Sequence, residues 1–299
     1  MGAVPFAKGH GTGNDFVLFA DPEGSMTVSP EAVAAICDRH RGIGADGLIR
    51  AVRSRNLPEG QVLLATEPNA EWFMDYRNAD GSLSEMCGNG VRVFVHFLLD
   101  QGLVALLPGE SLTIGTRAGR KDVLRTSEGY AVDMGPWEFI FPEQAENRGV
   151  DSLVTAAGLD VARPAVSISM GNPHTVVALA HDLELAGTDL STQPTVDPLP
   201  VHGTNVEFTV PSDPLVADGM GTITMRVHER GVGETQSCGT GACAAAAATR
   251  FWAGVEAPDA WRVNVPGGAV AVTFFAAADG SEHILLSGPA VLVAHGVLT

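Results

Sequence analysis

The sequence predicts an α+β fold made of two related, strand-rich halves, each built around one buried helix. The first observation is a short cysteine motif that occurs twice, as Cys87-Gly-Asn-Gly and as Cys238-Gly-Thr-Gly. Each copy follows a strand-like segment and a polar turn, and each opens a helix-like run. The second observation is that the order of segments before the motif is also repeated. Such a repeat is typical of two halves with a common architecture.

The repeated order extends well upstream of each cysteine. Asn78 ends a strand-like run nine positions before Cys87, and Glu229 ends another nine positions before Cys238. Earlier still, Gly-Asn turns at Asn14 and Asn172 open the strand-like runs 16–19 and 175–179. The order of Gly-Asn turn, strands, cysteine motif and helix therefore occurs twice, which predicts a pseudo-symmetric pair of halves.

Three segments have the pattern of helices: 30–40, 88–101 and 239–252. In the first, Ser29 is placed to cap the helix and Pro30 takes its first position. The other two are apolar on nearly every side, which is typical of a buried helix. Alternating residues at 205–210, and the run that ends at Glu229, favour strands. Each half should therefore wrap a sheet around a central helix.

The boundary between the halves is expected near 126–129, where the pattern is weakest. The tail 288–294 is strand-like and is expected to return to the first half. We therefore predict one domain of residues 1–128 plus 286–299 that carries Cys87, and a second of residues 129–285 that carries Cys238.

The composition excludes several function classes. A formal net charge of −17 over 299 residues argues against nucleic acid or an anionic membrane as a partner. The N-terminus does not have the pattern of a signal peptide, and the run 269–278 is too short to span a membrane. We expect a cytoplasmic protein that acts on a small molecule.

No cofactor or metal is expected. The only lysines, Lys8 and Lys121, are not in a recognisable setting for a pyridoxal-phosphate Schiff base, and there is no phosphate-binding loop. The four cysteines lack zinc spacing, and Cys37 and Cys243 lie in helix patterns that favour the core. The segment 8–13 superficially resembles a dinucleotide fingerprint, but a strand follows it, so we expect a tight turn beside the pocket.

Cys87 and Cys238 are the two cysteines at helix starts, where the helix dipole favours a thiolate. If a substrate carbon lies between them, a thiolate can remove its proton while a thiol delivers one to the opposite face, which inverts the stereocentre. Backbone N–H groups of Gly88 and Asn89, and of Gly239 and Thr240, are placed to stabilise the negative charge that develops.

Amide and charged residues near these motifs suit a zwitterionic substrate, since arginine binds carboxylate and glutamate accepts from ammonium. They are Asn14, Asn78, Asn89, Asn172, Asn205, Glu229 and Arg230. Each has a structural alternative, because asparagine is a common turn residue. His174 is equally consistent with a residue that orients a thiol and with a core histidine.

On these motifs the sequence resembles the diaminopimelate epimerases, which belong to a cofactor-independent racemase and epimerase superfamily. The motifs occur in family order over almost the whole chain: 8–15, 42–47, 78–82, 86–90, 171–174, 205–208 and 229–241. Gly47 stands where some members have glutamine. The resemblance implies interconversion of LL- and meso-2,6-diaminopimelate, in lysine and peptidoglycan-precursor synthesis, by a homodimer with the site between its two domains.

The resemblance also implies residue roles. Cys87 and Cys238 would be the acid/base pair, assisted by His174 and Glu229. The reacting carboxylate would meet the N–H groups of Gly88, Asn89, Gly239 and Thr240, and the reacting ammonium would meet Asn14 and Glu229. The distal centre would be held by Asn78, Asn172, Asn205 and Arg230.

Two alternatives stay open at this point. A proline or hydroxyproline racemase uses paired cysteines on a similar fold, although Asn89 and the pair Glu229-Arg230 disfavour it. A thiol redox protein would use the same two cysteines, which could form a disulfide if their Cα atoms approach within about 7 Å. Even in an epimerase, we expect mild oxidation to abolish activity and dithiothreitol to restore it.

Overall fold

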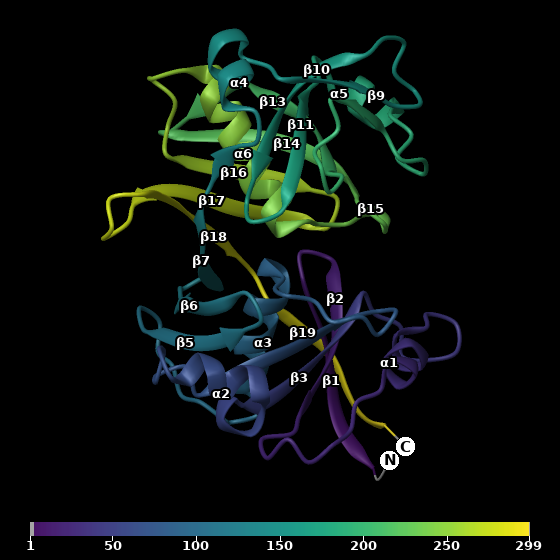
Figure 1. The fold of residues 1–299 in the computed structure, drawn as a ribbon, viewed down its shortest axis with the longest axis vertical. Coiled ribbons are helices and arrows are strands. Elements are labelled where there is room, and N and C mark those ends of the chain that lie inside the picture. The colour runs from purple at the N-terminus through teal and green to yellow at the C-terminus, as the bar shows by residue number, and fades with distance from the viewer. Residues whose placement is uncertain (1–2, 299) are drawn as a thin grey trace. The chain divides into compact units, whose positions relative to one another are not determined.

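The computed structural model describes residues 3–298, which form two compact units (Figure 1). Unit 1 runs up to Asp133 and resumes at Gly288, and unit 2 is Met134–Ser287. The sequence analysis places boundaries at 128/129 and 285/286, five and two residues before those of the two units. Residues 126–129 form the turn between two strands of unit 1, closed by the Thr126 N–H donating to the Gly129 carbonyl.

Unit 1 is a curled sheet around one helix. Its strands are β1 (Val4–Gly11), β2 (Asn14–Ala20), β3 (Gly47–Arg53), β4 (Trp72–Asn78), β5 (Ser111–Thr116), β6 (Gly119–Arg125), β7 (Tyr130–Pro136) and β19 (Val291–Leu298). They pair in the order β19-β1-β2-β3-β4-β5-β6-β7. The tail of the chain therefore returns to the first unit as expected. The helices are α1 (Pro30–Cys37), α2 (Pro58–Leu64) and α3 (Gly88–Asp100), with a 3₁₀ turn at Ser54–Asn56.

Unit 2 repeats this plan. Its strands are β8 (Glu138–Phe139), β9 (Ser152–Thr155), β10 (Arg163–Ser169), β11 (Pro173–Ala178), β12 (Thr195–Asp197), β13 (Asn205–Ala217), β14 (Met220–Glu229), β15 (Gly233–Thr235), β16 (Ala260–Val265), β17 (Gly268–Ala276) and β18 (Glu282–Gly288). The helices are α4 (Pro142–Arg148), α5 (Asp182–Gly187) and α6 (Gly239–Ala253).

The two units have the same topology. In unit 1 the pairs from β1 to β6 run antiparallel, parallel, antiparallel, parallel and antiparallel. In unit 2 the pairs β10–β11, β11–β13, β13–β14, β14–β16 and β16–β17 run in the same succession. In both, the central helix is inserted between the fourth and fifth of these strands. The predicted α+β fold of two pseudo-symmetric halves is confirmed.

Both central helices are buried, as their apolar character predicts. In unit 1, α3 packs against β1, β2, β3, β4, β6 and β19, and Phe94 and Phe97 are almost fully buried on it. In unit 2, α6 packs against β10, β11, β13, β14, β16 and β17 through an alanine run whose members are 0–1% exposed. Small side chains allow close approach of the sheet on every side of α6, whereas α3 fills the same space with aromatic rings.

Several local predictions need correction. The helix predicted at 30–40 ends at Cys37, because the Asp38 carboxylate accepts the N–H groups of His40 and Arg41 and turns the chain. Its Ser29 cap is confirmed. The segment 8–13 is mostly strand β1, and the turn is confined to Thr12 and Gly13. The other two helices end one residue from the predicted positions.

Two kinds of feature are absent from the part of the chain that the structure describes. No helix within residues 3–298 is long and apolar enough to cross a membrane. No group of three or more histidine, cysteine, aspartate or glutamate side chains in that range is arranged to hold a metal ion.

Candidate active site

Cys87 is the N-cap residue of α3, as its motif predicts. Its sulfur accepts the N–H of Gly90 at 3.5 Å, and it lies 3.3 Å from the Asn14 side-chain oxygen. Asn89, in the first turn of α3, donates its Nδ2 to the same Asn14 oxygen at 3.3 Å. Unit 1 therefore brings together three of the predicted site residues, with the thiol at the positive end of a buried helix.

Asp46 fixes the orientation of the Asn14 amide. Asn14 Nδ2 donates to Asp46 Oδ2 at 2.8 Å, and a carboxylate only accepts, so the Asn14 oxygen must face Cys87. Arg39 holds the Asp46 and Asp15 carboxylates at 2.7 and 2.8 Å. Burial raises the pKa of Asp15, but Arg39 and Lys8 outweigh burial and lower it to about 2. Because an amide oxygen only accepts, the Asn14 contact suits Cys87 as a thiol.

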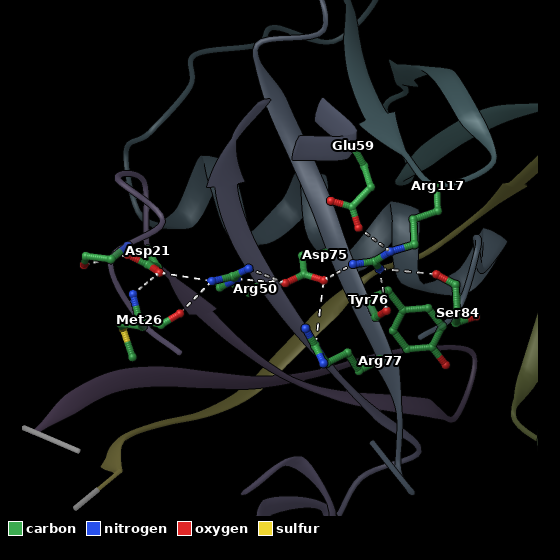
Figure 2. A network of polar contacts seen from close by, with 10 residues as sticks. Asp21, Met26, Arg50, Glu59, Asp75, Tyr76, Arg77, Ser84 and Arg117 are labelled. Carbon is green, nitrogen blue, oxygen red and sulfur yellow. Dashed lines mark hydrogen bonds and ion pairs between the residues drawn. The ribbon is translucent and has the colours of Figure 1, made fainter. Parts of the chain in front are cut away.

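The loop that leads to Cys87 is anchored by a buried ionic network (Figure 2). Arg117 donates to the backbone carbonyls of Tyr76 and Ser84, on either side of that loop, and to Asp75. The fully buried Asp75 also accepts from Arg50, through Nε at 2.8 Å and Nη2 at 2.7 Å. The position of Cys87 therefore depends on charges in the middle of β3 and β4.

Cys238 is the N-cap residue of α6 and is 7% exposed. Burial raises the pKa of its thiol well above the ordinary value, and the nearby Glu229 and Glu207 carboxylates raise it further. The Thr240 hydroxyl, 3.6 Å from the sulfur, and the Gly241 N–H oppose this rise by donating to the thiolate. Cys238 is therefore a thiol at neutral pH, with two donors ready for its thiolate.

His174 lies behind Cys238 in a buried polar cluster. Its Nδ1 is 2.7 Å from Glu207 Oε1, and its Nε2 is 3.1 Å from Asn172 Oδ1. Asn205 Nδ2 faces Nδ1 at 3.5 Å, and the Asn172 Nδ2 donates to Thr240 Oγ1 at 3.4 Å. The sequence is consistent with His174 either as a residue that orients a thiol or as a core histidine. In the structure His174 is fully buried, and hydrogen bonds also link it through Asn172 to the Cys238 motif.

The other predicted residues lie at the ends of neighbouring strands. Glu229 ends β14 and accepts from the Thr235 hydroxyl, and the Arg230 N–H donates to Asn205 Oδ1 at 2.9 Å. The Arg230 guanidinium donates to the His202 carbonyl. Asn78 ends β4 and donates to Ser82 Oγ at 3.0 Å, separately from the Asn14 cluster. Gly88 and Gly239 are the first residues of α3 and α6.

Asp46 and Glu207 contact predicted site residues but are themselves absent from the sequence-based prediction. Asp46 lies in the motif 42–47, and Glu207 alternates with Val206 and Phe208 along β13. Alternation made Glu207 look solvent-facing, yet the whole stretch 205–210 is buried, because α6 covers that side of the sheet. The apolar character of α6 was the signal that could have revealed this burial.

The repeated topology of strands and central helix defines a fold that solved structures share. This chain superposes on a phenazine biosynthesis protein of the PhzF family from Bacillus anthracis with a TM-score of 0.68 at 16% identity, and the match covers 100% of both chains. With a hydroxyproline epimerase from Agrobacterium vitis, the TM-score is 0.60 at 14% identity, and the match covers 99% of this chain and 91% of that one. At these identities the likeness establishes the fold.

The sequence comparisons establish the family. The diaminopimelate epimerase family profile matches residues 6–140 and 166–293. The chain is 44% identical to a diaminopimelate epimerase of Streptomyces coelicolor, over 98% of this chain and 94% of that one. It is 45% identical to a diaminopimelate epimerase of Thermobifida fusca, over 97% and 96%. The chain belongs to the diaminopimelate epimerase family.

Proposed function

We propose that this protein epimerises LL-2,6-diaminopimelate to the meso isomer, without a cofactor, using Cys87 and Cys238 as the acid/base pair. The observation that carries the proposal is the repeated placement of a cysteine at the N-cap of the central helix in both units. Family membership supports the substrate. The pathway role that follows is lysine and peptidoglycan-precursor synthesis.

The two thiols would act in turn on one substrate carbon. Cys87 as thiolate removes the α-proton, and Cys238, which holds its proton because burial and two carboxylates raise its pKa, delivers one to the opposite face. After the transfer, Cys87 as a thiol donates to the Asn14 oxygen, and the Cys238 thiolate accepts from Thr240 and Gly241. The roles are exchanged in the reverse direction, and the two thiols titrate as a coupled pair.

The remaining polar residues would bind the substrate. The first-turn N–H groups of Gly88, Asn89, Gly239 and Thr240 have no intrahelical partner in an α-helix, and they would hold the reacting carboxylate. Asn14 and Glu229 would meet the reacting ammonium, with His174 and Glu229 assisting the thiols. The distal centre would be bound by Asn78, Asn172, Asn205 and Arg230.

Incubation of the reduced protein with LL-diaminopimelate in D2O tests this proposal. We expect deuterium at the α-carbon and formation of the meso isomer with nothing added. Exchange with proline or hydroxyproline, but none with diaminopimelate, would transfer the assignment to the racemases. Free thiols with no exchange on any of these substrates would favour the redox alternative.

We further propose that the enzyme works as a cytoplasmic homodimer. Its support is the edge strand β19, which pairs with β1 and exposes Val291, Val293 and Val297. Val293→Asp with Val297→Asp should shift the sedimentation coefficient from dimer to monomer. Val255→Asp, at a fully exposed valine outside the strand, is the matched control. A wild-type monomer would contradict the proposal.

A further inference from the structure

The residues behind the two cysteines differ at equivalent positions of the two units. In unit 1, Phe16 on β2 and Ile49 on β3 lie near Gly90, the third residue after Cys87. In unit 2, His174 on β11 and Glu207 on β13 occupy the matching places, since Leu18 faces Ile49 and Val176 faces Glu207 in the two registers. The fold therefore accepts an apolar pair where unit 2 has a polar one.

The polar pair is deeply buried. His174 and Glu207 are both 0% exposed, and Glu207 Oε2 has no hydrogen-bond partner among the residues that the structure describes. Burying such groups with incomplete hydrogen bonding is unfavourable. Since Phe16 and Ile49 fill the equivalent space without this cost, the pair is better explained by an effect on its neighbours than by a need of the fold.

Glu207 lies against the helix turn that carries Cys238. A Cβ placed on Gly241 would lie 2.7 Å from Glu207 Oε1 and 3.3 Å from the Cys238 sulfur. Glycine at this position therefore allows the carboxyl group to sit directly behind the first turn of α6.

From His174, which Glu207 contacts, hydrogen bonds run in one direction to Cys238. The Asn172 oxygen only accepts, so His174 Nε2 carries a hydrogen and Nδ1 faces Glu207. The Asn172 amide nitrogen then donates to Thr240 Oγ1, which leaves the hydroxyl hydrogen of Thr240 for the Cys238 sulfur. The bond between Glu207 and Nδ1 can have either direction, because a carboxylate accepts from an imidazolium and a carboxylic acid donates to a neutral imidazole. In both cases Nε2 keeps the hydrogen that it donates to Asn172.

We propose that Glu207 is a positioning residue that, through His174 and Asn172, presents the Thr240 hydroxyl as a donor to the Cys238 thiolate. The inference rests on the proposed function, in which Cys238 becomes a thiolate each time it delivers a proton. In unit 1 the equivalent places hold Phe16 and Ile49, and Asn14 offers Cys87 an acceptor, so the two cysteines have different surroundings although their helices are equivalent.

Glu207 also has a second, opposite effect that the experiment must separate. Titratable groups near the Cys238 end of α6 include Glu229 on β14, Glu207 on β13 and His174 on β11. The carboxylate charge of Glu207 disfavours the thiolate, whereas its hydrogen bond to His174 supports the donor chain. Glu207→Gln and Glu207→Met both remove the charge and have similar length, but only glutamine can keep a hydrogen bond to Nδ1.

The experiment follows the rate at which Cys238 reacts with methyl methanethiosulfonate as a function of pH, read by peptide mass spectrometry. We expect the pH at which Cys238 becomes reactive to be about one unit higher in Glu207→Met than in Glu207→Gln, because one donor to the thiolate is lost. Cys87 in the same samples should react alike in both variants. With diaminopimelate, kcat should be about tenfold lower in the methionine variant at similar KM.

Thr240→Val supplies the matched background, because it removes the hydroxyl that donates to the Cys238 sulfur. In that background the difference between glutamine and methionine should disappear. Equal reactivity of the two variants, or the same difference with valine at 240, would overturn the proposal. If Glu207→Met does not fold, Glu207→Leu supplies the same comparison. The thiol measurement needs no substrate, so its failure is distinguishable from a failure of epimerisation.

Discussion

Asp75→Asn should destabilise unit 1 more than any change at an exposed ion pair. Asp75 is 0% exposed and lies between Arg50 and Arg117, whose side chains are 8% and 11% exposed (Figure 2). Asparagine fills the same space but removes the negative charge, which leaves these two guanidinium groups, and that of Arg77 at 3.8 Å, facing a neutral amide.

The expected loss in the free energy of unfolding is about 3 kcal/mol. Removal of one partner of a buried ion pair costs about 3–5 kcal/mol. The lower value applies because Arg50 keeps a contact to Asp21 at 3.4 Å and Arg117 keeps one to Glu59 at 3.4 Å. This loss is a large part of a total stability of about 5–15 kcal/mol.

Urea unfolding followed by circular dichroism measures the loss, and hydrogen exchange of β3 and β4 peptides locates it in unit 1. Asp122→Asn is the matched control, because its pair with Arg120 is 40–46% exposed and should contribute less than about 1 kcal/mol. An Asp75→Asn protein within 1 kcal/mol of wild type would refute the reasoning.

Three further predictions concern the helix starts and the core. Gly241→Ala should force Glu207 away from α6 and lower kcat for meso-diaminopimelate formation at least tenfold. An unchanged kcat would show that Glu207 is free to move. Gly221→Ala, whose Cβ would lie 2.4 Å from the Trp261 ring, should cost about 1–3 kcal/mol in urea unfolding, and a neutral effect would contradict the close approach. Burial, with the Asp15 and Asp46 charges, raises the pKa of Cys37 to about 11, above the ordinary 9.0. The contribution of the Cys37 thiol to the free energy of unfolding should therefore be complete below pH 9 and should be lost as the pH rises through about 11. Urea unfolding of Cys37→Ala over the same pH range should not show this loss.

The sequence predicts those features that depend on local pattern. The cysteine motif places a thiol at a helix start in each half, and Cys87 and Cys238 are indeed the N-caps of α3 and α6. The all-round apolar character of the two helices predicts their burial. The repeat of segments predicts two units with one topology.

The features that sequence reasoning missed depend on contacts between distant strands. Glu207 alternates with apolar residues, so it fits an exposed face until α6 is placed over the sheet. Asp46 meets Asn14 from 32 positions away, across the parallel pair of β2 and β3. Such contacts follow from the register of strands, which no single segment specifies.

The most direct test of the central claim is the rate of epimerisation by Cys87→Ser and by Cys238→Ser, each compared with wild type on LL-diaminopimelate. Since positioned acid and base groups contribute about 10²–10⁴-fold each, both variants should lose at least two orders of magnitude in kcat. Circular dichroism should show that both retain the fold. Turnover within tenfold of wild type in either variant would contradict the two-thiol account.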